Sequence, residues 1–266
     1  MLAHTVNLPR SFDLNPNTYG IREGQTASVP VAAGDATRPV TPATGGVRRL
    51  TTSESGGSAH FAGLYLTGRY QATGTLLFDA NYVLSRSRTD TEDINFNATQ
   101  ANRFDLEYAD AVNDRRHKAA VRATYTGVRN LTLGTVLDFQ TGTPINRAAG
   151  FDANGVALDL DGSGDTYGNA FLGNQDRFFG VPRNGERLPN AFRADVSAAF
   201  RLPAGVGGLE LRADVFNVFN TVNESGFANG IGGGGSRTQY GRPGDPVFFG
   251  SVAPPRQIQL SARYAL

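Results

Sequence analysis

The stretch Gln257-Ile-Gln-Leu-Ser-Ala-Arg-Tyr-Ala-Leu266 ends the chain and decides its fold. Every second side chain in it is apolar or aromatic: Ile258, Leu260, Ala262, Tyr264 and Leu266. The side chains between them are polar, apart from Ala265. Because successive side chains of a β-strand point to opposite faces, this period of two predicts a strand with one apolar and one polar face.

The same alternation recurs upstream in seven further segments: residues 47–53, 59–71, 75–86, 117–126, 130–140, 191–202 and 208–219. We therefore predict about eight antiparallel strands. Most segments are roughly ten to thirteen residues long, which suits a tilted strand that crosses a membrane. Strands of soluble proteins are usually about five or six residues long.

The connections between these segments alternate in length. Short turns are expected at 71–74, 127–130 and 203–208. Long polar loops are expected at 87–116, 141–190 and 220–254. Outer-membrane barrels combine short periplasmic turns with long extracellular loops. The pattern thus predicts an all-β fold with turns on one side and loops on the other, a partial or C-terminal section of an outer-membrane β-barrel. A soluble sandwich with its apolar face turned inward is the alternative.

Two regions are expected along the chain. Residues 1–46 contain five prolines and no sustained period, which predicts an irregular Pro/Gly-rich connection with at most one short strand, near 28–32. Residues 47–266 are expected to hold the transmembrane strands. The start has neither a basic segment nor an apolar segment of a signal peptide. Val6-Asn7-Leu8-Pro9 resembles the tail of a strand that begins further upstream, so we expect a fragment of a longer protein.

Composition excludes several function classes. The 25 basic and 24 acidic residues are interspersed, so nothing favours nucleic acid as a partner. The absence of cysteine excludes disulfides and thiolate metal sites. The histidines at 4, 60 and 117 lie far apart and lack metal-ligand spacing, and no serine has the context of a nucleophile elbow. We expect the protein not to be an enzyme.

Charged side chains share the predicted polar face of the last three strands: Arg193, Asp195, Glu210, Arg212, Asp214 and Arg263. We interpret them as lining the lumen of a barrel, where they would form a pore wall or contact a plug. The simpler interpretation is cross-strand ion pairing that only satisfies polar groups.

One long loop carries the motif Asp159-Leu-Asp161-Gly-Ser-Gly-Asp165. Carboxylates at alternate positions followed by glycine resemble the start of a calcium-binding loop, because Ca²⁺ prefers several oxygen ligands. Asp159, Asp161 and Asp165 are the candidate ligands within residues 152–165. The position of the usual bidentate glutamate is occupied by Ala170. The alternative is a solvated loop in which aspartate and glycine form turns.

Several short motifs resemble those of one family, in the same order. They are Ser58-Ala-His-Phe-Ala-Gly-Leu64, Asn81-Tyr-Val-Leu-Ser-Arg-Ser87, Asp114-Arg-Arg-His117, Thr141-Gly-Thr-Pro144, Arg183-Asn184 followed by Asp195, Asp214-Val-Phe-Asn-Val-Phe-Asn220, and the terminal Arg-x-Tyr-x-Leu. Over residues 58–266 the chain is similar to the C-terminal part of TonB-dependent outer-membrane receptors, most closely the Oar-like branch.

This resemblance implies a cell outer-membrane protein that takes part in energised uptake of a bulky substrate. It implies outer-membrane lipid and the barrel-assembly machinery as partners, the latter recognising Leu260, Tyr264 and Leu266. Leu266 stands where the family usually has Phe. Nothing in the chain resembles the plug or the TonB box, so contact with TonB would pass through a missing plug, and upstream strands would also be missing. The alternatives are a self-contained eight-stranded barrel acting as an adhesin or structural protein, and a soluble secreted β-protein.

Overall fold

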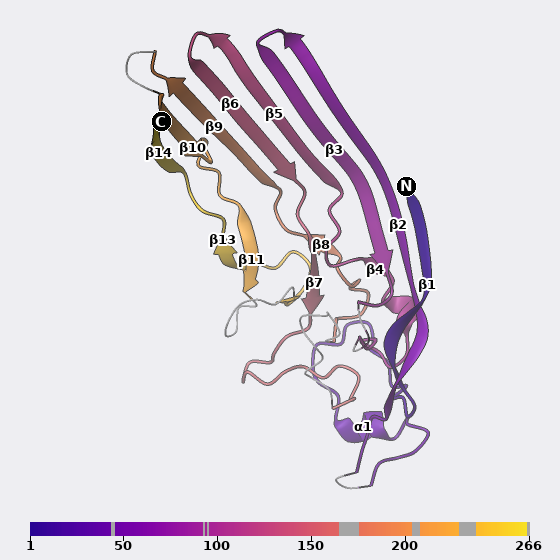
Figure 1. Cartoon of the computed structure of the whole chain (residues 1–266). Coiled ribbons are helices and arrows are strands. Elements are labelled where there is room, and N and C mark those ends of the chain that lie inside the picture. The colour runs from indigo at the N-terminus through magenta and orange to yellow at the C-terminus, as the bar shows by residue number, and fades with distance from the viewer. Residues whose placement is uncertain are drawn as a thin grey trace.

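The chain is described by a computed structural model that covers residues 1–43, 46–92, 94, 96–164, 176–203, 208–228 and 238–264. One nine-stranded sheet dominates it, and its ladders are all antiparallel (Figure 1). The main path runs through β1 (Leu2–Asp13), β2 (Thr51–Thr73), β3 (Leu76–Thr89), β5 (His117–Val128), β6 (Leu131–Gln140), β9 (Ala191–Arg201), β10 (Leu209–Phe216) and β14 (Gln257–Tyr264). The ninth strand, β4 (Ala109–Asp110), pairs with β3. The predicted all-β fold of long antiparallel strands is confirmed.

The first strand differs from the one predicted. Residues 47–53 form no separate strand, because β2 runs continuously from Thr51 to Thr73. Its outer neighbour is β1, inside the region expected to be irregular. The ladder between β1 and β2 shifts register on both sides of Leu8, and Asn7 has a φ of 60°. Such a bulge disturbs the alternation of side chains, which explains why period two did not reveal β1.

The short strand expected near residues 28–32 is also wrong. The helix α1 (Val31–Asp35) begins there instead, directly after Pro30. Proline fits the start of a helix because it lacks a backbone N–H, and the first N–H groups of a helix have no intrahelical partner.

The register of the main sheet gives it two different faces. One row of consecutive cross-strand partners crosses the sheet from β2 to β14. It consists of Tyr70, Phe78, Ala123, Thr135, Val196, Val215 and Ile258. We call this side the apolar face; its further members include Leu64, Leu133, Leu211 and Leu260. We call the opposite side the polar face; it carries Arg69, Asp79, Arg122, Asp138, Arg193, Arg212 and Arg263.

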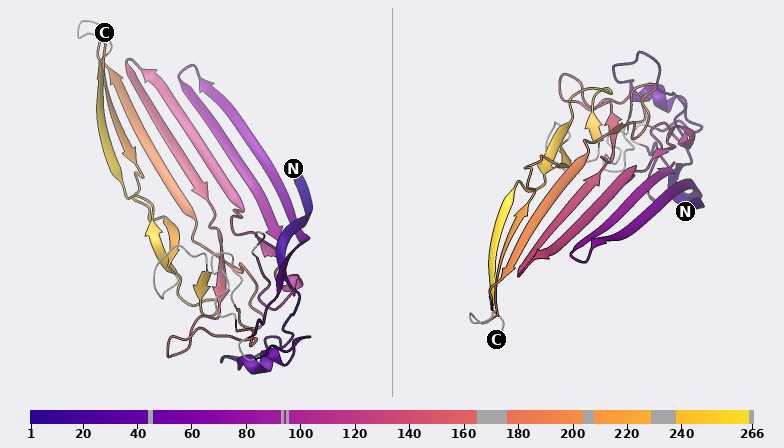
Figure 2. Two further views of the ribbon diagram at one scale, coloured as in Figure 1. Left: turned by 60° about the horizontal axis from the view of Figure 1, so that its bottom comes forward. Right: turned by 90° about the horizontal axis from the view of Figure 1, so that it is seen from above.

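The apolar face is bare in the described part of the chain. The side chains of Leu64 and Leu260 are exposed, as are those of Val196 and Leu211. The two views of Figure 2 show the strands as one curved layer, and no second sheet or helix covers them over most of their length. A soluble sandwich would bury such a face against a second layer, so the arrangement matches the membrane interpretation.

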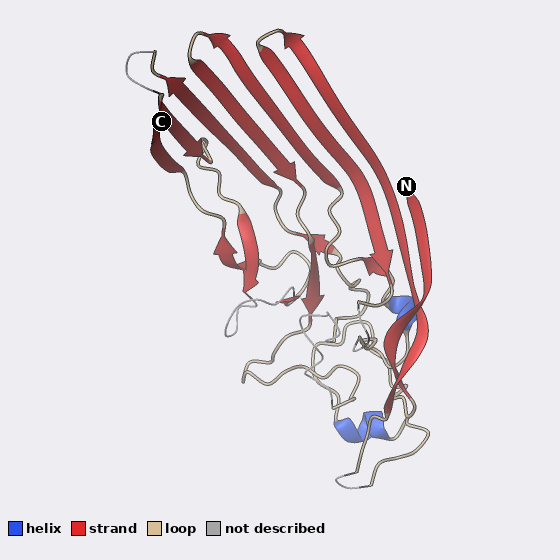
Figure 3. Cartoon of the chain, viewed as in Figure 1, coloured by secondary structure: helices blue, strands red, loops and turns tan. Residues whose placement is uncertain are grey.

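Turns and loops separate at the two ends of the sheet. The short connections after β2 and β5 lie together at one end, where β9 also ends and β10 begins. The described parts of the long connections gather at the other end (Figures 1 and 3). We call the second group the loop layer, meaning the described parts of 14–50, 90–116, 141–190 and 217–256. This separation confirms the predicted alternation of connection lengths.

The loop layer holds its own regular structure and most of the buried residues. Short strands β7 (Pro144–Ala148), β8 (Glu186–Arg187), β11 (Glu224–Ala228), β12 (Thr238–Tyr240) and β13 (Phe248–Val252) lie in it, together with a 3-10 helix at Phe104–Leu106. Its buried apolar clusters centre on Ile145, Leu160 and Phe96. Among the described residues, no helix is long and apolar enough to cross a membrane.

Candidate functional site

The six charged residues predicted to line a lumen fall on the polar face. Glu210 lies opposite both Arg201 and Arg263 in the register, and Arg212 lies between Ala199 and Ser261. The ion pairs connect neighbours along a strand: Arg193 with Asp195 and Arg212 with Asp214, each at 2.7 Å. Arg201 and Glu210 form a cross-strand pair at 3.3 Å. That this face lines a lumen stays a prediction.

Asp195 also fixes the chain that leaves β10. One of its carboxylate oxygens accepts a hydrogen bond from the backbone N–H of Asn217 at 2.8 Å. Asn217 has a φ of 51°, and its side chain accepts a hydrogen bond from the Thr221 N–H and donates one to the Thr221 carbonyl oxygen. Asn220 repeats the left-handed conformation with a φ of 52°. Asparagine tolerates this conformation better than most residues, which gives the Asn-x-x-Asn motif a structural role.

Buried arginines connect the segments of the loop layer. Arg183 is fully buried; its Nε donates to the Glu107 carbonyl oxygen at 2.8 Å, and Nη1 forms an ion pair with Glu92. Glu107 is fully buried as well, and its carboxylate accepts a hydrogen bond from Arg177 Nη2 at 2.8 Å. Arg183 Nη2 donates to the Thr89 carbonyl oxygen, so this network extends to the end of β3.

A second arginine pairs with Asp114, which in turn connects two of the sequence motifs. Arg187 forms ion pairs with Asp110 at 2.6 Å and with Asp114. Asp114 also accepts a hydrogen bond from the Ser87 backbone N–H at 2.7 Å. Asp114 belongs to the Asp114–His117 motif, but the sequence does not predict its pairing with Arg187. Sequence spacing gives no sign of such a contact between distant loops.

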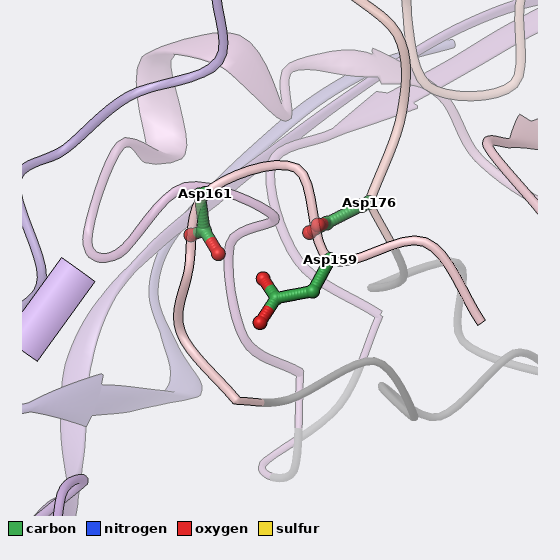
Figure 4. Close-up of side chains that lie close together, drawn as sticks. All are labelled: Asp159, Asp161 and Asp176. Atoms are coloured by element: carbon green, nitrogen blue, oxygen red, sulfur yellow. The ribbon is translucent and has the colours of Figure 1, made fainter. Parts of the chain in front are cut away.

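Three buried aspartates converge in the loop layer. Asp159, Asp161 and Asp176 each offer a carboxylate oxygen, and these oxygens lie within 4.8 Å of one another (Figure 4). Two of the three predicted calcium ligands are thus brought together. The third, Asp165, lies outside the described residues, and Asp176 was missed because nothing in its local sequence marks it.

Hydrogen bonds and burial determine how readily the three carboxyl groups of this cluster ionise. Asp159 accepts from the backbone N–H groups of Ser163 and Gly164, and Asp176 accepts from that of Leu160. Burial raises the pKa of Asp161 to about 6. Burial, followed by repulsion from Asp161, raises the pKa of Asp176 well above its usual range. Without a cation, the ionised cluster therefore opposes folding.

The rest of the predicted 152–165 site is arranged differently. Asp152 accepts hydrogen bonds from the backbone N–H groups of Asn154 and Val156, at 2.9 and 2.8 Å. This is a turn stabilised by its first side chain.

Of the proposed assembly signal, Leu260 and Tyr264 are exposed members of the apolar face on β14, and Leu266 lies outside the described residues.

A sheet of long strands with one bare apolar face and one charged face belongs to the class of transmembrane β-barrels. Comparison with protein families agrees: the outer membrane beta barrel domain matches residues 3–259. The chain therefore belongs to the outer-membrane β-barrel domain family, and its location is the outer membrane. This also fits the absence of any layer over the apolar face in the described residues.

Solved structures give the same class of fold. Two chains match, and one of them is the outer membrane transporter YddB from Escherichia coli. It is 11% identical in sequence, with a TM-score of 0.50 over 98% of this chain, and this likeness shows the fold alone. The chain spans 29% of the length of that transporter. No curated protein matches the sequence.

Proposed function

We propose that the chain is the C-terminal section of the barrel of a TonB-dependent outer-membrane receptor, which takes up a bulky substrate without chemical conversion. The observation that carries this proposal is the open sheet. Among the described residues, β1 and β14 are the end strands, and no ladder joins them. Unpaired backbone groups are costly in hydrocarbon, so these edges need further strands.

The size of known barrels supports the same arrangement. Outer-membrane transporters with a plugged lumen have about 22 strands, far more than the eight of the main path here. The motifs that resemble those of TonB-dependent receptors fall on structural positions described above, including Asp114, Asp195 and Asn217. In the proposed receptor, upstream strands complete the ring and the polar face turns towards a plug.

In the proposed mechanism, the loop layer and the two faces of the sheet have different roles. The loop layer captures the substrate outside the cell. The networks of the buried Arg183 and the half-buried Arg187 keep its segments in a fixed arrangement. Energy delivered by TonB displaces the plug, and the charged polar face forms the wall along which the substrate passes. The apolar face contacts outer-membrane lipid, and the barrel-assembly machinery recognises β14.

Isolation of the native protein tests this proposal. An antibody against the loop layer should capture a polypeptide much larger than 28.3 kDa from the outer membrane, and this polypeptide should crosslink to TonB in energised cells. A 28.3 kDa polypeptide that migrates as a compact, heat-modifiable barrel would contradict the proposal. That result would support the self-contained eight-stranded adhesin or structural barrel.

We also propose that the aspartate cluster binds Ca²⁺. Ca²⁺ takes six to eight oxygens at about 2.3–2.6 Å, so two ligands of one ion can stand up to about 5 Å apart. The convergence of Asp159, Asp161 and Asp176 within 4.8 Å fits this requirement. The cation would offset the burial and the mutual repulsion that raise the pKa of Asp161 and Asp176.

Calorimetric titration with Ca²⁺ tests the cluster. Asp161→Asn and Asp176→Asn should each abolish or strongly weaken binding, because each removes a charged ligand. Asp152→Asn is the matched control: it changes an aspartate of the same loop that lies outside the cluster, and binding should persist. No binding at millimolar Ca²⁺, or equal loss in the Asp152 variant, would contradict the proposal.

A further inference from the structure

Two histidines that lie far apart in sequence meet on the first two strands. His4 of β1 and His60 of β2 are direct cross-strand partners. Their rings stack with centroids 3.9 Å apart and planes inclined by 12°. Both side chains are exposed. Sequence spacing gave no sign of this pair, because only the register of β1 on β2 creates it.

The hydrogen-bonding pattern explains the close approach of these rings. Met1 and Gly63 exchange two backbone hydrogen bonds, at 2.6 and 2.8 Å. Hydrogen-bonded and non-hydrogen-bonded pairs alternate along an antiparallel ladder, and no register shift occurs between Leu2 and Val6. His4 and His60 are therefore a non-hydrogen-bonded pair, in which side chains stand closest.

A third residue orients His60. The hydroxyl of Tyr108, in the loop layer, lies 2.9 Å from His60 Nδ1. When His60 Nδ1–H donates to this oxygen, the lone pair lies on Nε2 and points away from Tyr108. Histidines that bind metals almost always donate their second ring N–H in this way, which fixes the tautomer and the ring orientation.

We propose that His4 and His60 form a binding site for a divalent transition metal, with Tyr108 as the positioning residue of His60. Two imidazoles suit Cu²⁺, Ni²⁺ and Zn²⁺, whereas Ca²⁺ and Mg²⁺ prefer oxygen ligands. The rings must tilt so that their lone pairs converge on one ion. Exposed side chains can make this movement while the strands stay in place, and water molecules complete the coordination.

Because the two histidines lie on neighbouring strands, a bound metal ion would stabilise the pairing of β1 with β2. His60 lies on the same side of β2 as Leu64 and Leu66, closer to the loop layer. The site is therefore at the edge of the apolar face, between β2 and β1, the strand that ends the sheet. An ion shared by β1 and β2 binds only while these strands are paired, so it stabilises their pairing by mass action. Arg88 is the other cross-strand neighbour of His60 and brings positive charge to the site, which limits its affinity.

Copper titration followed by electron paramagnetic resonance tests this site on the full chain in detergent. The spectrum should show two coordinated imidazole nitrogens, and His4→Ala or His60→Ala should each leave only one. His117→Ala is the matched control, since it removes the remaining histidine and should change nothing. Tyr108→Phe keeps both imidazoles and should weaken binding by about tenfold, the lower range for loss of an outer hydrogen bond to a ligand.

The results separate this site from the aspartate cluster. Affinity should follow the order Cu²⁺ above Ni²⁺ and Zn²⁺, and excess Ca²⁺ should not displace Cu²⁺. A spectrum that still shows two imidazole nitrogens in His4→Ala or in His60→Ala, or that loses one in His117→Ala, would overturn the proposal. Folding of each variant is checked by the circular dichroism of the sheet, so a failure to fold is not mistaken for a loss of ligands.

Discussion

Arg183 and Glu107 stand 76 residues apart and are joined inside the loop layer, where Arg183 Nε donates to the Glu107 carbonyl oxygen at 2.8 Å. Both side chains are fully buried. Removal of one partner from a buried ion pair costs about 3–5 kcal/mol, and Arg183 forms ion pairs with both Glu92 and Glu107. Arg183→Ala should therefore unfold the loop layer locally while the strands remain paired. Hydrogen exchange measures this: amides of 90–116 should lose protection, and those of β9 and β10 should keep it.

The control for this prediction is a paired arginine in an exposed position of the same layer. Arg103 forms an exposed ion pair with Asp105, and exposed pairs contribute little to stability. Arg103→Ala should leave the exchange pattern unchanged. If Arg183→Ala behaves like Arg103→Ala, the buried network does not hold the loops together.

The aspartate cluster predicts a dependence of stability on pH in the absence of metal. Because the folded-state pKa of Asp161 is raised to about 6, the folded state binds more protons than the unfolded state. Stability is therefore fully present below the unfolded pKa of about 4 and falls as pH rises through about 6. The loss from Asp161 amounts to about 3 kcal/mol, since each pKa unit corresponds to about 1.4 kcal/mol.

Chemical unfolding between pH 4 and pH 7 with a chelator present measures this effect. Asp161→Asn should flatten the decline, because the amide does not ionise. Ca²⁺ should do the same for the unchanged protein. A stability that rises over this interval with and without Asp161 would show that the pKa of Asp161 is not raised in the folded protein.

The left-handed turn after β10 makes a prediction about Asn217. Asn217→Ala removes its two side-chain hydrogen bonds with Thr221 and places alanine at a φ of 51°. The combined loss should be about 2–3 kcal/mol. Asn217→Gly also loses the hydrogen bonds but relieves the backbone strain, so it should lose less. If thermal unfolding shows the same loss of stability for both variants, the left-handed backbone conformation at residue 217 does not affect stability.

The sequence predicted the central strands well, because segments such as 130–140 and 191–202 keep an uninterrupted alternation. It failed at β1, where the irregularity around Leu8 breaks the alternation. The two-sided character of the sheet also followed from period two, but register did not. Contacts that depend on register or loop packing, such as His4 with His60 and Asp161 with Asp176, therefore could not be predicted.

The central claim is that the apolar face contacts lipid, and two adjacent residues at the middle of β9 test it. Val196 lies on the apolar face and Ser197 on the polar face. An arginine that faces lipid near the middle of the membrane destabilises a barrel strand by about 2–4 kcal/mol, whereas lumen positions tolerate charge. The measurement is folding into lipid vesicles, at equilibrium in urea, of the native outer-membrane polypeptide that contains this chain, carrying Val196→Arg or Ser197→Arg. Our account predicts a loss of this size for Val196→Arg and little change for Ser197→Arg, and equal tolerance of both, or the reverse order, would contradict it.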